Sequence, residues 1–285
     1  MVAVILLRNT TSDIRKILEN LVQGKIDVDE AIRLLRLFSI QSIETSVKFD
    51  EGRILRRDIP EIVIAEGKDP QTLVKLIEKL VPRIGKVIIS RLSGEHMDAI
   101  KRFTQSKNMV LKLNEIGRIA VIELRGTTEK HKLPCKVGLI TAGTADLHVA
   151  EEARVVIEEM GCNVITIYDV GIAGLHRTLA AVRRLKEEDV DAVIVIAGME
   201  GALPSIVASL LDIPVIGVPT SVGYGAGAKG WAALLSMLQA CPLGLAVVNI
   251  DNGVNAAIIA SLIARRIGVM REKLNKCSSN TVLSS

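Results

Sequence analysis

The stretch "GLITAGTADLHVAEEA", Gly138–Ala153, decides how the second half of the chain folds. Its apolar run predicts a strand that ends near Ala142, and the acidic amphipathic segment from Asp146 predicts a helix. A glycine turn between strand and helix leaves free backbone N–H groups ahead of the helix, where anions bind. The turn lacks the third glycine of a dinucleotide fingerprint and the lysine of a P-loop. It therefore predicts a phosphate site of another kind.

Strand and helix signals alternate regularly from this stretch onward. We expect strands at residues 137–141, 163–168, 192–197, 214–218 and 245–250, and helices at 146–160, 175–187, 203–211, 228–240 and 254–267. Nearly all-aliphatic strands separated by helices are typical of a parallel sheet that is buried on both faces. The predicted fold class is α/β, with a doubly wound parallel sheet of flavodoxin-like layering. Ligands of such sheets bind beyond the carboxyl ends of the strands.

The first half of the chain predicts a smaller helical plus α/β part. Two helices and a charged connector fill residues 1–60, and strand and helix signals over residues 61–125 predict a small α/β domain. Residues 126–134 are polar and unperiodic, which predicts a linker. The catalytic domain is expected at 135–276 and a disordered tail at 277–285.

Composition excludes several classes of protein. Among 285 residues with a net charge of +4, only three Phe, two Tyr and one Trp occur, too few for nucleic-acid recognition by base stacking. No window has the ~18 consecutive apolar residues of a membrane helix, and the apolar start is too short for a signal peptide. We expect a cytoplasmic protein that binds neither nucleic acid nor membranes. Four scattered cysteines without a CxxC pair argue against a zinc site or a disulfide framework.

The loops after the five strands share a composition that indicates a site. They are rich in Gly, Ser and Thr, and they hold several ionisable residues: Asp146, Asp169, His176, Glu200, Lys229 and Asp251. Each has an ordinary structural alternative. Asp146 is equally typical of a helix N-cap, an isolated histidine is more often structural than catalytic, and Cys241 is more typical of a buried packing residue. Five such loops at one edge of one sheet nevertheless predict a binding site.

The loop sequences together resemble a known family. "TAGTADLHVAEEA", "YDVGIAGLHR", "AGMEGALPSIVASL", "PVIGVPTSVGYGAG" and "VVNIDNG" are similar to LarB, the pyridinium-3,5-biscarboxylic acid mononucleotide synthase of nickel-pincer cofactor biosynthesis. That family carries a domain like that of PurE, the carboxyaminoimidazole ribonucleotide mutase. The stretch "FDEGRILRRDIPEIVIAEGK" resembles the first LarB domain, so the resemblance covers nearly the whole chain.

The resemblance implies a carboxylase and hydrolase. Its substrate would be nicotinic acid adenine dinucleotide, carboxylated on the pyridinium ring with CO2 or bicarbonate and then hydrolysed at the phosphoanhydride to release AMP. Cys241 matches the family's cysteine, which adds to the ring, and we place it at the carboxyl edge of the sheet. Mg²⁺ is the implied cofactor, with ligands that the sequence does not identify. PurE-like domains assemble as octamers, so a homo-oligomer is implied.

Residue roles are carried over by position. The implied catalytic residues are Cys241, Glu200, His176 and Asp146, and the implied substrate-binding residues are Thr141, Gly143, Thr144, Asp169, Gly198, Gly201, Ser221, Tyr224, Gly225, Asp251 and Asn252. Asp146 would accept a ribose hydroxyl or a proton, and Glu200 the ring proton. The turn departs from the family at Ala145, where Ser is common, and at His148, where Pro is expected. These changes put the phosphate contact in doubt.

Two other functions fit the same fold. An aminoimidazole ribonucleotide carboxylase or mutase would need neither a nucleophilic cysteine nor release of AMP. A non-catalytic nucleotide-binding module would need no thiol at all.

Overall fold

The computed structural model describes residues 10–38, 59–126 and 132–282. The chain divides into two compact units, residues 1–61 and 62–285. The first unit contains two helices, α1 (Thr10–Val22) and α2 (Val28–Phe38). Asp27 starts α2 by accepting a 2.7 Å hydrogen bond from the Glu30 N–H. The two predicted N-terminal helices are confirmed, and most of the predicted connector lies outside the described residues.

The second unit begins with a four-stranded sheet. Its elements are β1 (Ile62–Ile64), α4 (Pro70–Ile84), β2 (Lys86–Ser90), α5 (Gly94–Gln105), β3 (Met109–Asn114) and β4 (Ile119–Leu124). The strand order is β1-β2-β4-β3, in which β1 and β2 are parallel and the other pairs antiparallel. Asp69 caps α4 by accepting from the Thr72 N–H, and Pro70 occupies the first turn, where its missing N–H costs nothing.

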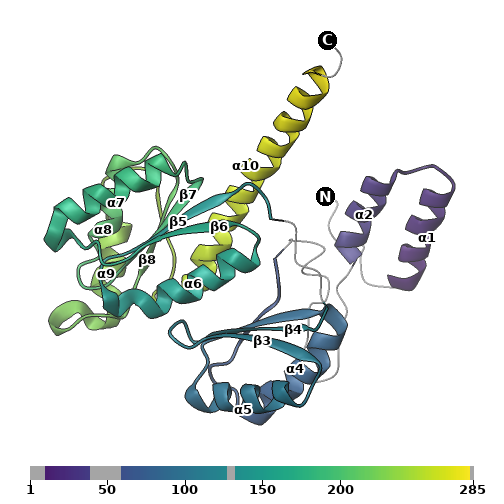
Figure 1. Cartoon of the computed structure of the whole chain (residues 1–285), viewed down its shortest axis with the longest axis horizontal. Helices are drawn as coiled ribbons and strands as arrows, with labels where there is room; N and C mark the ends of the chain where they lie inside the picture. The colour runs from purple at the N-terminus through teal and green to yellow at the C-terminus, as the bar shows by residue number, and fades with distance from the viewer. Residues whose placement is uncertain (1–9, 39–58, 127–131, 283–285) are drawn as a thin grey trace, which may run out of the picture. The chain divides into compact units, whose positions relative to one another are not determined.

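The second sheet has five parallel strands in the order β6-β5-β7-β8-β9 (Figure 1). Its strands are β5 (Lys136–Thr141), β6 (Asn163–Ile167), β7 (Ala192–Ala197), β8 (Val215–Pro219) and β9 (Leu245–Val247). The connecting helices are α6 (Leu147–Glu159), α7 (Leu175–Glu187), α8 (Leu203–Leu210) and α9 (Trp231–Leu238), and α10 (Gly253–Val282) follows β9. From β5 the chain passes to β6 on one side, and from β6 it crosses to β7 on the other side of β5. A topological switch point therefore lies between β5 and β7. The predicted doubly wound parallel sheet is confirmed.

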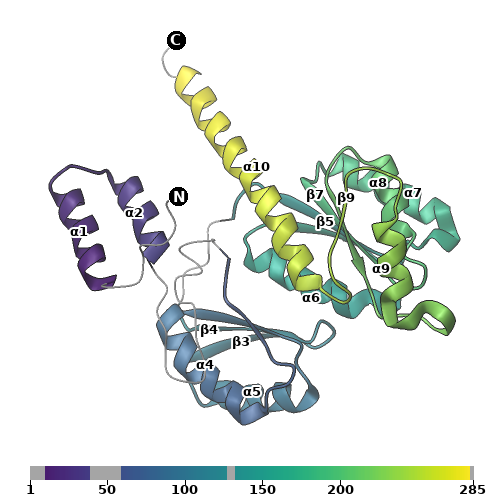
Figure 2. The same ribbon diagram turned by 180° about the vertical axis from the view of Figure 1, so that it is seen from behind.

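Helices cover both faces of this sheet. α6 and α10 pack together over one face, and α8 and α9 contact β7, β8 and β9 from the other (Figures 1 and 2). The central strand β7 is buried along its whole length, as expected for aliphatic strands between two helical layers.

Helix α10 is longer than the sequence predicts. It continues to Val282, so the prediction of a disordered tail is wrong for residues 277–282. Its segment Gly253–Leu274 has the length and apolar composition of a membrane span, with a mean hydropathy of 1.4. Ala256, Ala257, Ala260 and Ala264 of this segment are buried against the protein's own core. Packing on the sheet therefore accounts for part of its apolar composition, since 39% of the segment is buried inside the protein.

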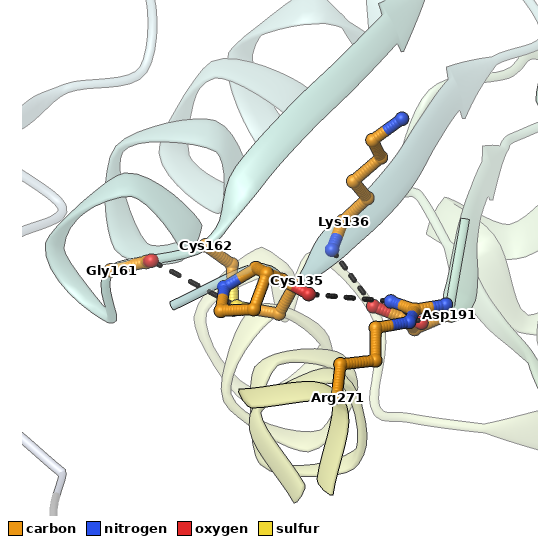
Figure 3. The surroundings of a disulfide bond; sticks show 7 residues. Cys135, Lys136, Gly161, Cys162, Asp191 and Arg271 are labelled. Atoms are coloured by element: carbon orange, nitrogen blue, oxygen red, sulfur yellow. Dashed lines mark hydrogen bonds and ion pairs between the residues drawn. A yellow bond between two sulfur atoms is a disulfide. The ribbon is translucent and has the colours of Figure 1, made fainter. Parts of the chain in front are cut away.

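A disulfide joins Cys135 and Cys162, whose Cα atoms are 5.1 Å apart (Figure 3). The expectation that the cysteines are unpaired is wrong for these two. The spacing of 27 residues between the two cysteines gave no sequence signal of a disulfide. In the structure, the register pairs Lys136 of β5 with Asn163 of β6. The residues just before these two strands therefore lie side by side at the amino edge of the sheet.

Candidate active site

Asp146 is the centre of the candidate site. It follows β5 in the turn of residues 144–146, and its side chain is buried, with 3% of its surface exposed. One carboxylate oxygen accepts a 3.0 Å hydrogen bond from the Gly143 N–H, and the other accepts a 2.7 Å bond from the Thr220 hydroxyl. The side chain does not cap α6. The helix-cap alternative therefore does not explain this aspartate.

Burial raises the pKa of the Asp146 carboxyl above its ordinary value, and the hydrogen bonds from Thr220 and Gly143 oppose that shift. Asp251 raises the pKa further through its negative charge. A carboxyl group in this state changes protonation closer to neutral pH than a solvated aspartate, which is what proton transfer in catalysis requires.

Gly198 keeps the space beside this carboxyl open. It follows β7, and a Cβ atom there would lie 2.3 Å from the Val222 carbonyl oxygen and 2.7 Å from the Thr220 hydroxyl oxygen. No side chain fits without displacing the Thr220 hydroxyl from Asp146. The turn after β5, the end of β7 and the end of β8 thus form one packed unit at the switch point.

The loop after β6 is also held in place by a hydrogen bond and an ion pair. Its implied catalytic residue, His176, lies outside the buried surroundings of Asp146. Thr141 is fully buried and its hydroxyl accepts a 3.2 Å hydrogen bond from the Asp169 N–H. Asp169 forms a 2.6 Å ion pair with Arg177. His176 lies exposed in the first turn of α7, and Thr144 is exposed at the start of its own turn. These two side chains are available to a ligand and do not contact Asp146 in the described structure.

The loops after β7, β8 and β9 complete the carboxyl edge. Glu200, the implied acceptor of the ring proton, is exposed beside Gly201. The Asp251 carboxylate accepts a 2.8 Å hydrogen bond from the Ser221 N–H and joins the last two loops. The Asn252 side chain accepts from the Asn255 N–H at the start of α10. Tyr224, before Gly225, is 83% exposed and leaves its ring free.

Four of these loops hold a non-glycine residue in the left-handed backbone conformation, and Lys229 in the loop after β8 is one of them, with a φ angle of 54°. Asp169, Met199 and Asp251 have φ angles of 58°, 52° and 54°. Such residues are uncommon, and they cluster at functional sites. The backbone therefore gives a second indication that the carboxyl edge is the site.

Cys241 does not lie at this edge. It precedes β9, and β9 is parallel to β8 with Leu245 opposite Val215 (Figure 1 labels β8 and Figure 2 labels β9). The residue before a parallel strand lies at the amino edge, so our placement of Cys241 at the carboxyl edge is wrong. The Val215 N–H bonds to the Gly244 carbonyl beside Cys241, whereas Ser221 lies six residues further along β8. At a strand rise of ~3.3 Å per residue, about 20 Å separates the two edges. Cys241 is exposed, and it is the free thiol among the cysteine side chains described.

Sequence reasoning missed Glu152. Its carboxyl is buried between α6 and the four-stranded sheet, where it accepts a hydrogen bond from the Ser90 hydroxyl. Burial raises its pKa, and the bond from Ser90 and the charge of Arg91 oppose the rise. A signal was present, because Glu152 falls on the apolar stripe of α6 formed by Val149, Ala153 and Val156.

A cluster for a metal ion is not found. In the part of the chain that the structure describes, no three His, Cys, Asp or Glu side chains gather closely enough to hold one. Mg²⁺ is usually held by one or two carboxylates together with substrate phosphates, so the implied Mg²⁺ stays a prediction, and we derive no step through it.

A large cavity lies away from the site. It has a volume of about 640 Å³ beside the amino end of β6 and contains four lysines, Lys86, Lys112, Lys132 and Lys136. Lys86 and Lys112 form ion pairs with Glu123, and Lys136 with Glu188. Most of its positive charge is therefore already balanced.

Comparison with known proteins divides the chain in the same way as the fold. The model of the AIR carboxylase family matches residues 136–282, that of the LarB/PurE-like N-terminal domain matches 40–125, and that of a SHOCT-like domain matches 12–39. An uncharacterized protein of Methanocaldococcus jannaschii is 43% identical over 255 residues, which are 89% of this chain and 97% of the relative.

Relatives with a stated activity match about half of this chain. The N5-carboxyaminoimidazole ribonucleotide mutase of Methanocaldococcus jannaschii is 37% identical over 148 residues, 48% of this chain and 89% of its own length. The mutase of Pyrococcus horikoshii is 35% identical over 147 residues, 49% of this chain and 78% of its own length. The four-stranded sheet is outside residues 136–282, which the AIR carboxylase model matches.

Proposed function

This chain belongs to the AIR carboxylase family, a family of carboxylase and mutase type, and on that premise we propose that it carboxylates nicotinic acid adenine dinucleotide and releases AMP. The observation that carries the proposal is the pairing of a LarB/PurE-like N-terminal domain with an AIR carboxylase domain in one chain. The buried Asp146, whose pKa is raised by burial, and the free thiol of Cys241 are the two kinds of group that this reaction would use.

The proposed chemistry starts with the Cys241 thiolate. It adds to the cationic pyridinium ring, and the new C–S bond removes the positive charge and makes the ring an enamine. The enamine carbon attacks CO2 and forms the C–C bond. Loss of the ring proton to a base, with Glu200 as our candidate, and departure of the thiolate restore the aromatic pyridinium. Water then attacks the phosphoanhydride, and AMP leaves from the carboxylated mononucleotide.

The position of Cys241 requires a second copy of the chain in this mechanism. A ring bound near Asp146 is about a strand length away from the thiol of the same chain. We therefore propose that the Cys241 segment of one copy reaches the carboxyl edge of another, in a homo-oligomer. Exposed apolar side chains support such a contact. Leu243 beside Cys241 is 93% exposed and Leu238 61%, and Tyr224 and Leu175 are exposed on the loops and helix at the carboxyl edge.

Mixing two inactive variants tests this proposal. Cys241→Ser and Asp146→Ala should each bind dinucleotide poorly or unproductively and form no carboxylated product. The two variants are unfolded, mixed in equal amounts and refolded into mixed oligomers. These should regain about one quarter of wild-type activity if subunits pair at random, because one interface in four then combines both intact residues. Product masses measured with bicarbonate and Mg²⁺ present report both carboxylation and AMP release.

Three outcomes contradict parts of the proposal. No recovery in the mixture means that the thiol and Asp146 must be intact in the same chain, which contradicts a site shared between two copies. A Cys241→Ser enzyme with normal turnover eliminates the covalent step. Carboxylation of aminoimidazole ribonucleotide, with none of the dinucleotide, favours the second candidate function, which the mutase relatives support.

A further inference from the structure

A cleft of about 220 Å³ lies between the four-stranded sheet and the carboxyl edge of the five-stranded sheet. One wall contains Arg91 and Arg118 of the smaller sheet, and the other contains Ser221 and Asp251 of the candidate site. The carboxyl groups of Glu66 and Glu152 belong to residues that line the cleft as well. His148, two residues after Asp146, also lines it. The cleft is therefore continuous with loops that the sequence predicts to bind substrate.

The fold brings the two arginines to the same end of the smaller sheet. Arg91 directly follows β2 and Arg118 directly precedes β4, and these strands are antiparallel neighbours with Ile89 opposite Ala120. The Arg118 side chain is fixed by a 2.6 Å hydrogen bond from its Nε to the Leu92 carbonyl oxygen. Both arginines have left-handed backbone conformations, with φ angles of 58° and 51°. The sheet thus presents two guanidinium groups at one point of its edge.

The smaller sheet is held tightly against α6, which keeps the cleft walls in place. The Asn114 side chain donates a 2.6 Å hydrogen bond to Glu151, and Ser90 donates to Glu152. Gly117 packs so closely on α6 that a Cβ atom would lie 2.6 Å from the Glu152 backbone nitrogen. Close backbone packing of this kind positions the adjacent Arg118.

The arginines keep donors available to an anion. The Nη groups of Arg118 make no hydrogen bond within the described residues. Arg91 bonds to the Glu66 carboxylate at 2.7 Å and to the Asp251 carbonyl oxygen at 3.3 Å. The pair with Glu66 is solvent-exposed, and such pairs are weak enough for a phosphate to replace. Guanidinium groups bind phosphate oxygens in a two-point geometry, which lysine cannot reproduce.

We propose that Arg91 and Arg118 form a second phosphate-binding subsite, which takes the adenylate-side phosphate of a dinucleotide whose other half lies near Asp146. This inference rests on the proposed function. It gives the smaller sheet a role in specificity, since this sheet lies outside the residues that the AIR carboxylase model matches. A mononucleotide needs one phosphate site, whereas a dinucleotide has a second phosphate to bind.

Binding measurements on the full chain test the subsite. Nicotinic acid adenine dinucleotide, nicotinic acid mononucleotide and aminoimidazole ribonucleotide are titrated into wild type, Arg118→Gln and Arg91→Gln by calorimetry. We expect each variant to lose about 10- to 100-fold in affinity for the dinucleotide, as for loss of a charged hydrogen bond, and to bind the mononucleotide as wild type does. Arg183→Gln, an exposed arginine on α7, is the matched control and should change neither affinity. Thermal unfolding of each variant checks that the fold is intact.

The possible results separate this inference from the proposed function. Unchanged dinucleotide affinity in folded Arg118→Gln and Arg91→Gln overturns the subsite and leaves the proposed function standing. An equal loss for mononucleotide and dinucleotide also overturns it, because the arginines then serve the first phosphate. Wild-type binding of aminoimidazole ribonucleotide without any binding of the dinucleotide overturns both.

Discussion

The two edges of the five-stranded sheet each hold a buried aspartate, and the two are bonded in opposite ways. At the amino edge Asp191 accepts a 2.8 Å hydrogen bond from the Lys136 N–H and forms a 2.7 Å ion pair with Arg271 of α10 (Figure 3). At the carboxyl edge the hydrogen-bond partners of Asp146 are neutral, the Gly143 N–H and the Thr220 hydroxyl.

This difference distinguishes a carboxylate that stabilises the fold from one that is suited to proton transfer. A buried charge with a cationic partner stabilises one geometry, and removing either partner leaves the other uncompensated. A buried carboxyl with neutral partners has a raised pKa and can gain or lose a proton during a reaction. The disulfide also lies at the amino edge, so the covalent link is on the side away from the candidate site.

The largest expected effect on turnover comes from replacing the carboxyl-edge aspartate. Asp146→Asn keeps the shape but removes the titrating group, so carboxylation should fall by about 10²- to 10⁴-fold. Product formation by mass spectrometry and thermal unfolding are measured together. Asp191→Asn is the matched variant at the other edge, and it should lower the unfolding temperature because Arg271 loses its buried partner and keeps the exposed Asp189, while turnover stays close to wild type. Equal turnover in the two variants would contradict the division between the edges.

An intermediate effect is expected on the pH dependence of stability. The raised pKa of Glu152 means that the folded state favours the neutral acid. Its contribution to the free energy of unfolding is therefore largest below the ordinary glutamate pKa and declines as the pH rises through the folded-state pKa. Glu152→Gln cannot titrate, so its unfolding free energy should fall less than that of wild type between about pH 4 and pH 8.

Urea unfolding at several pH values measures this dependence. Glu187→Gln, an exposed residue paired with Arg183 on α7, is the control and should follow the wild-type curve. Parallel curves for Glu152→Gln and wild type would show that this carboxyl does not titrate differently in the folded state.

The smallest effect on turnover is expected from the disulfide. The double change Cys135→Ser and Cys162→Ser opens a link across 27 residues of sequence. Loss of such a cross-link costs about 3.5 kcal/mol of unfolding free energy by the chain-entropy relation. Turnover at moderate temperature should stay the same, since both residues lie at the amino edge. Chemical denaturation with and without reductant measures the first quantity, and a large fall in turnover would contradict the second.

Much of the fold could be predicted from sequence because its signals are local. Aliphatic runs such as 192–197 predicted the strands of the parallel sheet, and a glycine turn before Asp146 predicted where β5 ends and the helical segment begins. The helical periodicity also predicted the helices between the strands. Helix α10 continues past its predicted end, because polar residues such as Ser278 and Ser279 extend a helix that is already formed.

The sequence by itself determined the parallel α/β architecture and the set of loops at its carboxyl edge, because strand and helix periodicity and turn composition are properties of neighbouring residues. Only the tertiary structure decided which distant residues meet. The register of β5 and β6 paired Cys135 with Cys162, and the end of β8 brought Thr220 to Asp146. The docking of the smaller sheet on α6 buried Glu152 and placed Arg91 in the cleft. These contacts depend on strand order and on packing between layers, which short-range sequence patterns do not contain.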